Sequence, residues 1–137
     1  MSKALGNHLL VELYGCDRAR LDDEEFLRAH GEAAAAAMRA TVVAVHSHRF
    51  EPVGVSVVVV LAESHLALHT WPEHGTASVD IFVCSPQTDP HRAKAHLADC
   101  LRAERCAELE LHRGRFDREQ AAQWRQLEMS ASTPRNN

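Results

Sequence analysis

The segment spanning residues 61–84, LAESHLALHTWPEHGTASVDIFVC, holds most of the side chains in this chain that could perform chemistry. A glutamate–serine pair, Glu63–Ser64, comes first. Four possible proton carriers or metal ligands follow it: His65, His69, His74 and Cys84. The residues between them are largely apolar or β-branched and favour strands, so a sheet is expected to position this chemistry.

The Glu63–Ser64 pair offers a hydroxyl next to a peptide carbonyl. If Ser64 attacks the carbonyl carbon of Glu63, an N-to-O acyl shift turns the backbone into an ester. Elimination from that ester leaves dehydroalanine, which hydrolyses to a pyruvoyl group on a new N-terminus and releases ammonia. The reaction needs strain at the Glu63–Ser64 bond, donors for the oxyanion and a nearby base, for which His69 and the hydroxyl of Ser56 are candidates.

Each of these residues also has a non-catalytic interpretation. A serine before a histidine in a β-rich segment is commonly a surface or ladder residue, and Cys84 at a strand end is commonly a small core residue. We interpret two further cysteines as packed or exposed residues that are not ligands: Cys100, in a predicted helix, and Cys106, near the start of a predicted strand. Residue chemistry alone leaves catalysis and a purely structural role both open.

A histidine-lined metal site is a second functional possibility. Two pairs of histidines lie at even spacing and would each share one strand face: His65 with His69, and His46 with His48. The acidic ligand would be Glu63 or Glu73. Because H-x-H patterns are common on strands, we expect no bound metal.

Length and composition restrict the class of protein. A chain of 137 residues is expected to form one domain around a single core. A net charge of −4 without a long run of like charge argues against nucleic acid as a partner. No apolar run approaches the roughly 18 residues of a membrane span, and the first residues do not resemble a secretion signal, so a cytoplasmic location is expected. The four cysteines contain no C-x-x-C pair, which argues against a zinc ribbon and a disulfide framework.

Hydrophobic periodicity predicts two helices and six strands. The helices are expected at residues 21–40 and 89–103, where acidic residues, Asp89 and Pro90 suit helix N-termini. The strands are expected at 8–15, 41–50, 54–62, 65–71, 77–84 and 105–114, with 41–50 and 54–62 joined as a hairpin through EPV.

This order predicts an α+β fold, a two-layer α/β sandwich with both helices on one face of a mostly antiparallel sheet. The runs at 55–62 and 79–84 are apolar on both faces, so a homodimer that packs sheet on sheet is expected to cover the second face. Residues 1–115 are predicted to form the domain, and residues 116–137 a polar, partly disordered C-terminal extension.

The segment ESHLALHTWPEHGTASVDIFVC resembles the self-processing, pyruvoyl-dependent S-adenosylmethionine decarboxylases of the short prokaryotic type. Their pattern reads E-S-H, alternating apolar residues, H-T-W-P-E, and then a D-hydrophobic-F-x-C strand. The resemblance extends to GNHLLVELYGCD and HRFEPVGVS, and it covers roughly residues 6–113.

The resemblance implies a role for each matching residue. Ser64 becomes the pyruvoyl precursor, with cleavage after Glu63 into a β chain of 1–63 and an α chain of 64–137. The matching processing residues are Ser56 and His69, the proton donor is Cys84, and the positions near the nucleoside of the substrate are Phe50 and Glu73.

The implied activity is decarboxylation of S-adenosylmethionine through a Schiff base to the pyruvoyl group, the only cofactor. The product is the aminopropyl donor for spermidine and other polyamines. The resemblance also implies a homodimer with the active site at its interface, and no membrane or nucleic-acid partner.

Three departures from the family pattern bear on the substrate: Val57 in place of glycine, His74 in place of an aromatic residue, and Ser85 in place of glycine. Relatives of this family act on arginine or ornithine, so the same chemistry on a basic amino acid is the alternative. An alternative of another class is a non-enzymatic, histidine-rich metal-binding domain.

Overall fold

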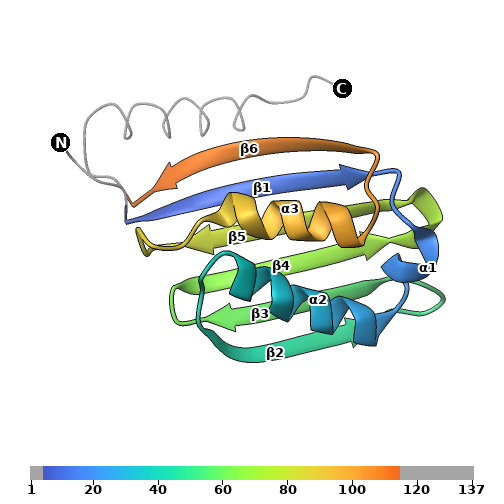
Figure 1. Cartoon of the computed structure of the whole chain (residues 1–137). Helices are drawn as coiled ribbons and strands as arrows, with labels where there is room; N and C mark the ends of the chain where they lie inside the picture. The colour runs from blue at the N-terminus through green and yellow to red at the C-terminus, as the bar shows by residue number, and fades with distance from the viewer. Residues whose placement is uncertain (1–4, 115–137) are drawn as a thin grey trace, which may run out of the picture.

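Six strands pair into one antiparallel sheet in the order β2-β3-β4-β5-β1-β6 (Figure 1). The computed structural model describes residues 5–114. The strands are β1 (Gly6–Tyr14), β2 (Val42–Arg49), β3 (Val55–Leu61), β4 (Ser64–Trp71), β5 (Thr76–Val83) and β6 (Arg105–Arg113). The order places β4 inside the sheet between β3 and β5, so the residues of β4 are held by hydrogen bonds on both sides.

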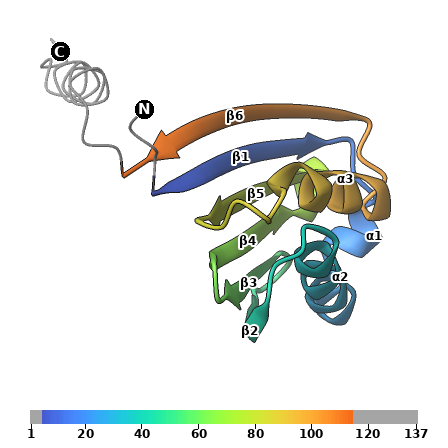
Figure 2. The same ribbon diagram turned by 60° about the vertical axis from the view of Figure 1, so that its left-hand side comes forward.

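Two main helices, α2 (Glu24–Ala37) and α3 (Pro90–Cys100), lie side by side on the same face of the sheet (Figures 1 and 2). The helix predicted at 21–40 begins only at Glu24, because Asp23 caps α2 by accepting a hydrogen bond from the backbone N–H of Phe26. The preceding residues form the short helix α1 (Arg18–Leu21). A 3-10 turn, η1 (Pro72–His74), joins β4 to β5.

The core lies between the helices and the sheet. Along β3 the odd-numbered residues are buried and the even-numbered ones are half-buried, as the period of two in a strand requires. Gly31 lets α2 approach this face closely, since a Cβ at this position would lie 3.3 Å from Cγ2 of Val59. Leu27 and Leu97, one from each helix, are fully buried in the same cluster.

The opposite face of the sheet, called here the open face, carries no helix among the described residues (Figure 2). Cross-strand pairing brings its residues into rows: Ser56 beside His69 and Ser78, Val58 beside Ala67 and Asp80, and Val60 beside His65 and Phe82. Leu109 of β6 also belongs to this face and is 57% exposed. The apolar side chains of this mixed face, Val58, Val60, Ala67, Phe82 and Leu109, could pack against a second sheet.

The predicted α+β class, the order of the elements and the placement of both helices on one face are confirmed. Dimerisation through the open face remains a prediction. The predicted extension at 116–137 lies outside the described residues, so the predicted division of the chain also remains a prediction. None of the helices in the described part of the chain is both long and apolar enough to cross a bilayer.

Candidate active site

The Glu63–Ser64 bond lies at the tip of the β3–β4 hairpin. Ser64 is the first residue of β4 and pairs with Leu61, so only two residues form the turn. Thr41 anchors this turn, because its carbonyl accepts from the N–H of Ala62 and its own N–H donates to both carboxylate oxygens of Glu63, at 2.8 and 3.1 Å. Thr41 therefore fixes the Glu63 carboxylate beside its own backbone N–H.

The carbonyl oxygen of Glu63 accepts two hydrogen bonds from a single residue. The backbone N–H and the thiol of Cys84 both donate to it, each at 3.1 Å. Two donors that converge on one carbonyl oxygen are the arrangement that stabilises an oxyanion when the carbonyl carbon is attacked. The sequence predicted Cys84 as a proton donor to substrate, and it did not predict this contact.

The backbone at Ser64 is strained. Its φ is 136°, in a region that residues with a side chain rarely adopt. A conformation of this kind costs on the order of 1–3 kcal/mol, which the surrounding hydrogen bonds must offset. The strain expected at the Glu63–Ser64 bond is therefore present on its serine side.

An imidazole nitrogen lies near the Ser64 hydroxyl: Nδ1 of His65 is 3.4 Å from Oγ. The His65 ring packs edge-on against His8, which in turn binds Asp80 and contacts Arg113. Sequence reasoning missed His8 and Asp80. In the sequence, the only sign of these two residues is that each occupies an outward-facing position of a predicted strand. Such a position identifies a face of the sheet and indicates no particular chemistry.

A second group of predicted residues lies at the other end of β4. Ser56 and His69 are cross-strand partners, and Ser56 Oγ lies 2.7 Å from His69 Nδ1. They line a cavity of about 400 Å³ together with Phe50 and Glu73. Trp71, which the sequence analysis did not single out, also lines this cavity and is 42% exposed. An aromatic pair beside an acidic side chain suits a flat, polar-edged ligand.

Asp22 fixes the turn that presents Phe50 to this cavity. Its carboxylate accepts from the N–H of Gly54 at 2.9 Å and from the guanidinium of Arg49 at 3.0 Å. The hydrogen bond from Gly54 holds the pKa of Asp22 below its usual value, and Arg49 acts in the same direction. The N–H of Phe50 donates to the Gly54 carbonyl at 2.8 Å, which closes the turn.

The two groups do not meet within one chain. Ser64 and His69 are five residues apart on one strand, and at about 3.3 Å per residue they are separated by roughly 16 Å. Cys84 lies at the Ser64 end, whereas Ser56, Phe50 and Glu73 lie at the His69 end. Within a single chain, His69 therefore lies too far from the Glu63–Ser64 bond to act as the predicted base.

The alternative of a histidine metal site is not supported by the positions of His65 and His69. His65 and His69 are four residues apart along an extended strand, and His69 is paired with Ser56. Within the described part of the chain, two other groups bring three possible ligand atoms within 4.8 Å of one another: His8 with His65 and Asp80, and His30 with His96 and Cys100. Long-range packing created both groups, so strand spacing could not identify them.

The three departures from the family pattern lie at different places. Val57 is fully buried on the helix-facing side of β3, near Gly31, and does not line the cavity beside Phe50. His74 is exposed on η1 and is also absent from that cavity. Ser85 lines a separate cavity of about 260 Å³ beside Cys84. The expected effect of Val57 on the substrate pocket therefore has no structural basis within one chain.

Comparisons with known proteins agree on one family. The family described as S-adenosylmethionine decarboxylase matches residues 7–114. The S-adenosylmethionine decarboxylase proenzyme of Thermotoga maritima is 47% identical over 115 residues, which are 84% of this chain and 88% of that protein. The proenzyme of Parasynechococcus marenigrum is 52% identical over 103 residues, 75% of this chain and 80% of that one. The crystal structure of the adenosylmethionine decarboxylase from Aquifex aeolicus superposes with a TM-score of 0.77 at 37% identity, covering 85% of this chain and 96% of that chain.

Proposed function

This chain belongs to the S-adenosylmethionine decarboxylase family of pyruvoyl-dependent carboxy-lyases, which are made as proenzymes, and we propose that its pyruvoyl group forms from Ser64. The activity of the family is the conversion of S-adenosylmethionine to its decarboxylated form and carbon dioxide. Cleavage between Glu63 and Ser64 divides the chain into residues 1–63 and 64–137. The observation that carries this proposal is the Glu63 carbonyl, which accepts two hydrogen bonds from Cys84 beside a strained serine.

The residues at this junction fit the formation of a pyruvoyl group. Attack by Ser64 Oγ on the Glu63 carbonyl carbon breaks the C–N bond and gives an ester with a free amine at residue 64. The two Cys84 donors stabilise the negative charge that develops on the carbonyl oxygen. Loss of the Ser64 α-proton then expels the Glu63 carboxylate and leaves dehydroalanine. Addition of water to its tautomer releases ammonia and leaves the ketone at residue 64.

Strain at Ser64 favours the first of these steps. The φ of 136° raises the energy of the intact peptide, and the acyl shift removes the peptide that imposes it. The Thr41 contacts keep the Glu63 carboxylate occupied, so this side chain does not compete for the two Cys84 donors. His65, at 3.4 Å from the hydroxyl, is the imidazole available within the same chain.

A second copy of the chain supplies the remaining residues of the site. We place a two-fold axis between two open faces, crossing β4 at right angles near Ala67. Ala67 lies midway between Ser64 and His69, so this axis brings the Ser64 end of one β4 over the His69 end of the other. Side chains of two such sheets interdigitate across about 10 Å. The exposed Leu109 and the half-buried valines of β3 support this mode of packing.

In this arrangement, the substrate binds between the two copies. The cavity beside His69 offers the rings of Phe50 and Trp71 to adenine, and Glu73 to the ribose hydroxyls or the sulfonium. A pyruvoyl group held at residue 64 would supply an electrophilic ketone and an electron sink for the decarboxylation. Cys84 lies beside residue 64 and is exposed, so its thiol can return a proton to the substrate α-carbon.

Intact-mass analysis of the purified chain tests self-processing. We expect two fragments, the larger beginning with a blocked residue 64, whereas Ser64→Ala stays full-length and remains folded by circular dichroism. A single full-length species of the wild-type chain after prolonged incubation would overturn the assignment of Ser64.

Mixed dimers test whether the site is shared between copies. Chains carrying Ser64→Ala and His69→Ala are co-expressed with different tags and purified as the mixed species. If His69 acts across the interface, the His69→Ala chain is cleaved in the mixed dimer and remains intact as a homodimer. Failure of cleavage in the mixed dimer excludes the shared site. Cleavage of the His69→Ala homodimer at the wild-type rate excludes the role of His69.

A further inference from the structure

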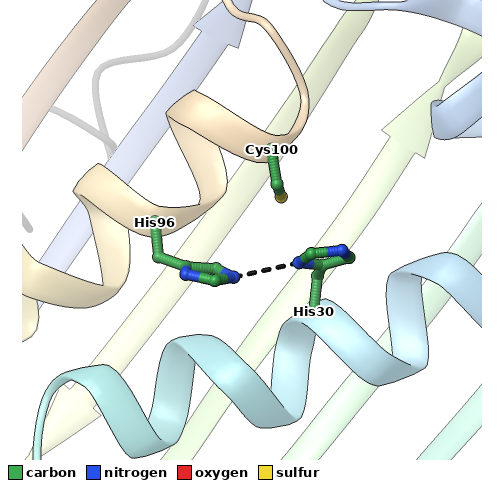
Figure 3. Close-up of side chains that lie close together, drawn as sticks. All are labelled: His30, His96 and Cys100. Atoms are coloured by element: carbon green, nitrogen blue, oxygen red, sulfur yellow. Dashed lines mark hydrogen bonds between the residues drawn. The ribbon is translucent and has the colours of Figure 1, made fainter.

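We propose that His30, His96 and Cys100 form a zinc site between α2 and α3, separate from the decarboxylase site. His96 and Cys100 are four residues apart on α3 and therefore share one face of that helix. His30 faces them from α2 (Figure 3). The sequence analysis interpreted Cys100 as a bystander and expected no metal, so this site depends on the packing of the two helices.

The distances within this group match a tetrahedral site. Nδ1 of His30 and Nε2 of His96 are 3.0 Å apart, and all three ligand atoms lie within 4.8 Å of one another. Zinc–nitrogen bonds of about 2.0 Å and zinc–sulfur bonds of about 2.3 Å require ligand atoms roughly 3.3–3.6 Å apart in a tetrahedron. The two imidazole nitrogens therefore need to separate by a few tenths of an ångström, and the rings must rotate until both lone pairs face the metal. The thiol needs to approach by at most about an ångström, which side-chain rotation can supply.

The donor set selects the type of metal. Two imidazole nitrogens and one thiolate suit a borderline-soft cation such as Zn²⁺ better than Mg²⁺ or Ca²⁺, which prefer oxygen ligands. Three protein ligands leave a fourth position for water. The hydrogen bond between the two rings is given up on binding, and each ring keeps one proton on its other nitrogen. Cys100 releases its thiol proton to solvent, so one proton leaves for each zinc bound.

The surroundings of the group position its members. The ring of Phe26 packs against His30 with centroids 4.2 Å apart, and the guanidinium of Arg20 lies 5.2 Å from the Phe26 centroid. Arg20 also donates to the Cys100 carbonyl at 2.6 Å. Burial raises the pKa of Cys100 to about 11, and the Arg20 charge opposes that shift.

The position of the site indicates its role. The helices cover one face of the sheet, whereas Ser56, His65 and His69 belong to the open face. Zinc bound at this position would link α2 to α3 without touching the decarboxylase residues. Binding to the folded chain alone raises the melting temperature by mass action. The metal is therefore expected to stabilise the fold and to have no part in the chemistry.

Cobalt binding to the full-length chain tests the site. Reduced, chelator-stripped protein is titrated with Co²⁺, and a near-ultraviolet thiolate-to-cobalt band with tetrahedral visible bands is expected to saturate at one equivalent. Cys100→Ser should abolish the thiolate band, and His96→Ala should weaken binding at least about tenfold. The matched controls Cys106→Ser and His91→Ala remove an exposed thiol and an exposed histidine, and should bind as wild type. Zn²⁺ should displace Co²⁺ and raise the melting temperature.

Two further measurements use the wild-type chain, so they do not depend on the folding of variants. One equivalent of Zn²⁺ should protect Cys100 from alkylation in a peptide map while leaving Cys106 reactive. Decarboxylation should be unchanged after chelation at a temperature where the apo chain is folded. Absence of the thiolate band, its persistence in Cys100→Ser, equal alkylation of Cys100 with and without zinc, or loss of decarboxylation on chelation would each overturn the proposal.

Discussion

Removing the thiol of Cys84 separates its contribution to chain cleavage from its contribution to decarboxylation. In Cys84→Ala the Glu63 carbonyl loses one of its two donors and keeps the other, the backbone N–H at 3.1 Å. Loss of one full-strength oxyanion donor slows a reaction about 10²–10³-fold. A thiol is a weaker donor than an amide, so we expect cleavage to slow by about 10- to 100-fold, or roughly 1.4–2.7 kcal/mol in the barrier.

The assay is a time course of cleavage after rapid refolding of the denatured precursor, followed by intact mass. Cys84→Ser keeps an O–H donor and should cleave faster than Cys84→Ala, while Cys106→Ala, which removes an exposed thiol elsewhere, should cleave as wild type. Once Cys84→Ala is fully cleaved, carbon dioxide release should no longer give the normally protonated product. Cleavage of Cys84→Ala at the wild-type rate would refute the oxyanion role. Formation of the normally protonated product at the wild-type rate would refute the role of Cys84 as proton donor.

Three other perturbations test the cavity, the turn that shapes it, and the core. Phe50→Ala should raise KM for S-adenosylmethionine by about 5- to 150-fold, which corresponds to the 1–3 kcal/mol of one base stack, and an unchanged KM would exclude stacking. The wild-type chain should turn over arginine and ornithine with a lower kcat/KM than S-adenosylmethionine. The pKa of Asp22 is lowered on folding, so its stabilising contribution is complete above its unfolded pKa of 3.8 and is lost as pH falls through the lower folded value. Melting temperatures of wild type and Asp22→Asn should therefore converge below pH 3.8, and a constant gap would contradict this linkage. Leu27→Ala should reduce the free energy of unfolding by about 2–5 kcal/mol in urea titrations, and a loss below 1 kcal/mol would contradict its placement in the core.

Local sequence signals predicted the elements well, because periodicity reports which face of an element is buried. The β-branched run of β3, the alternation in β6 and the helix-capping residues Asp89 and Pro90 identified strands and a helix within a few residues of their ends. The break between α1 and α2 was missed. The acids at 22–25 suit a helix N-terminus in general, and only the hydrogen bond from Phe26 to Asp23 shows where that terminus is.

The candidate site was predictable as a set of residues and unpredictable as an arrangement. Ser64, His69 and Cys84 were identified from their types and from a family resemblance. Their distances depend on strand register, which sequence spacing alone does not specify. Cys84 reaches Glu63 because β5 pairs with β4 in a register that sets Ser64 opposite Val83. The same register carries His69 to the far end of the strand.

The sequence by itself therefore determined which side chains are available and which face of each element is apolar, since both are properties of short segments. Only the tertiary structure decided which of those side chains meet. It joined Cys84 to the scissile carbonyl, separated His69 from Ser64, and brought His30 against His96 and Cys100, which are more than sixty residues away in the chain. Contacts of that kind arise when whole faces pack, so the positions of partner residues follow from the fold and cannot be inferred from neighbours in sequence.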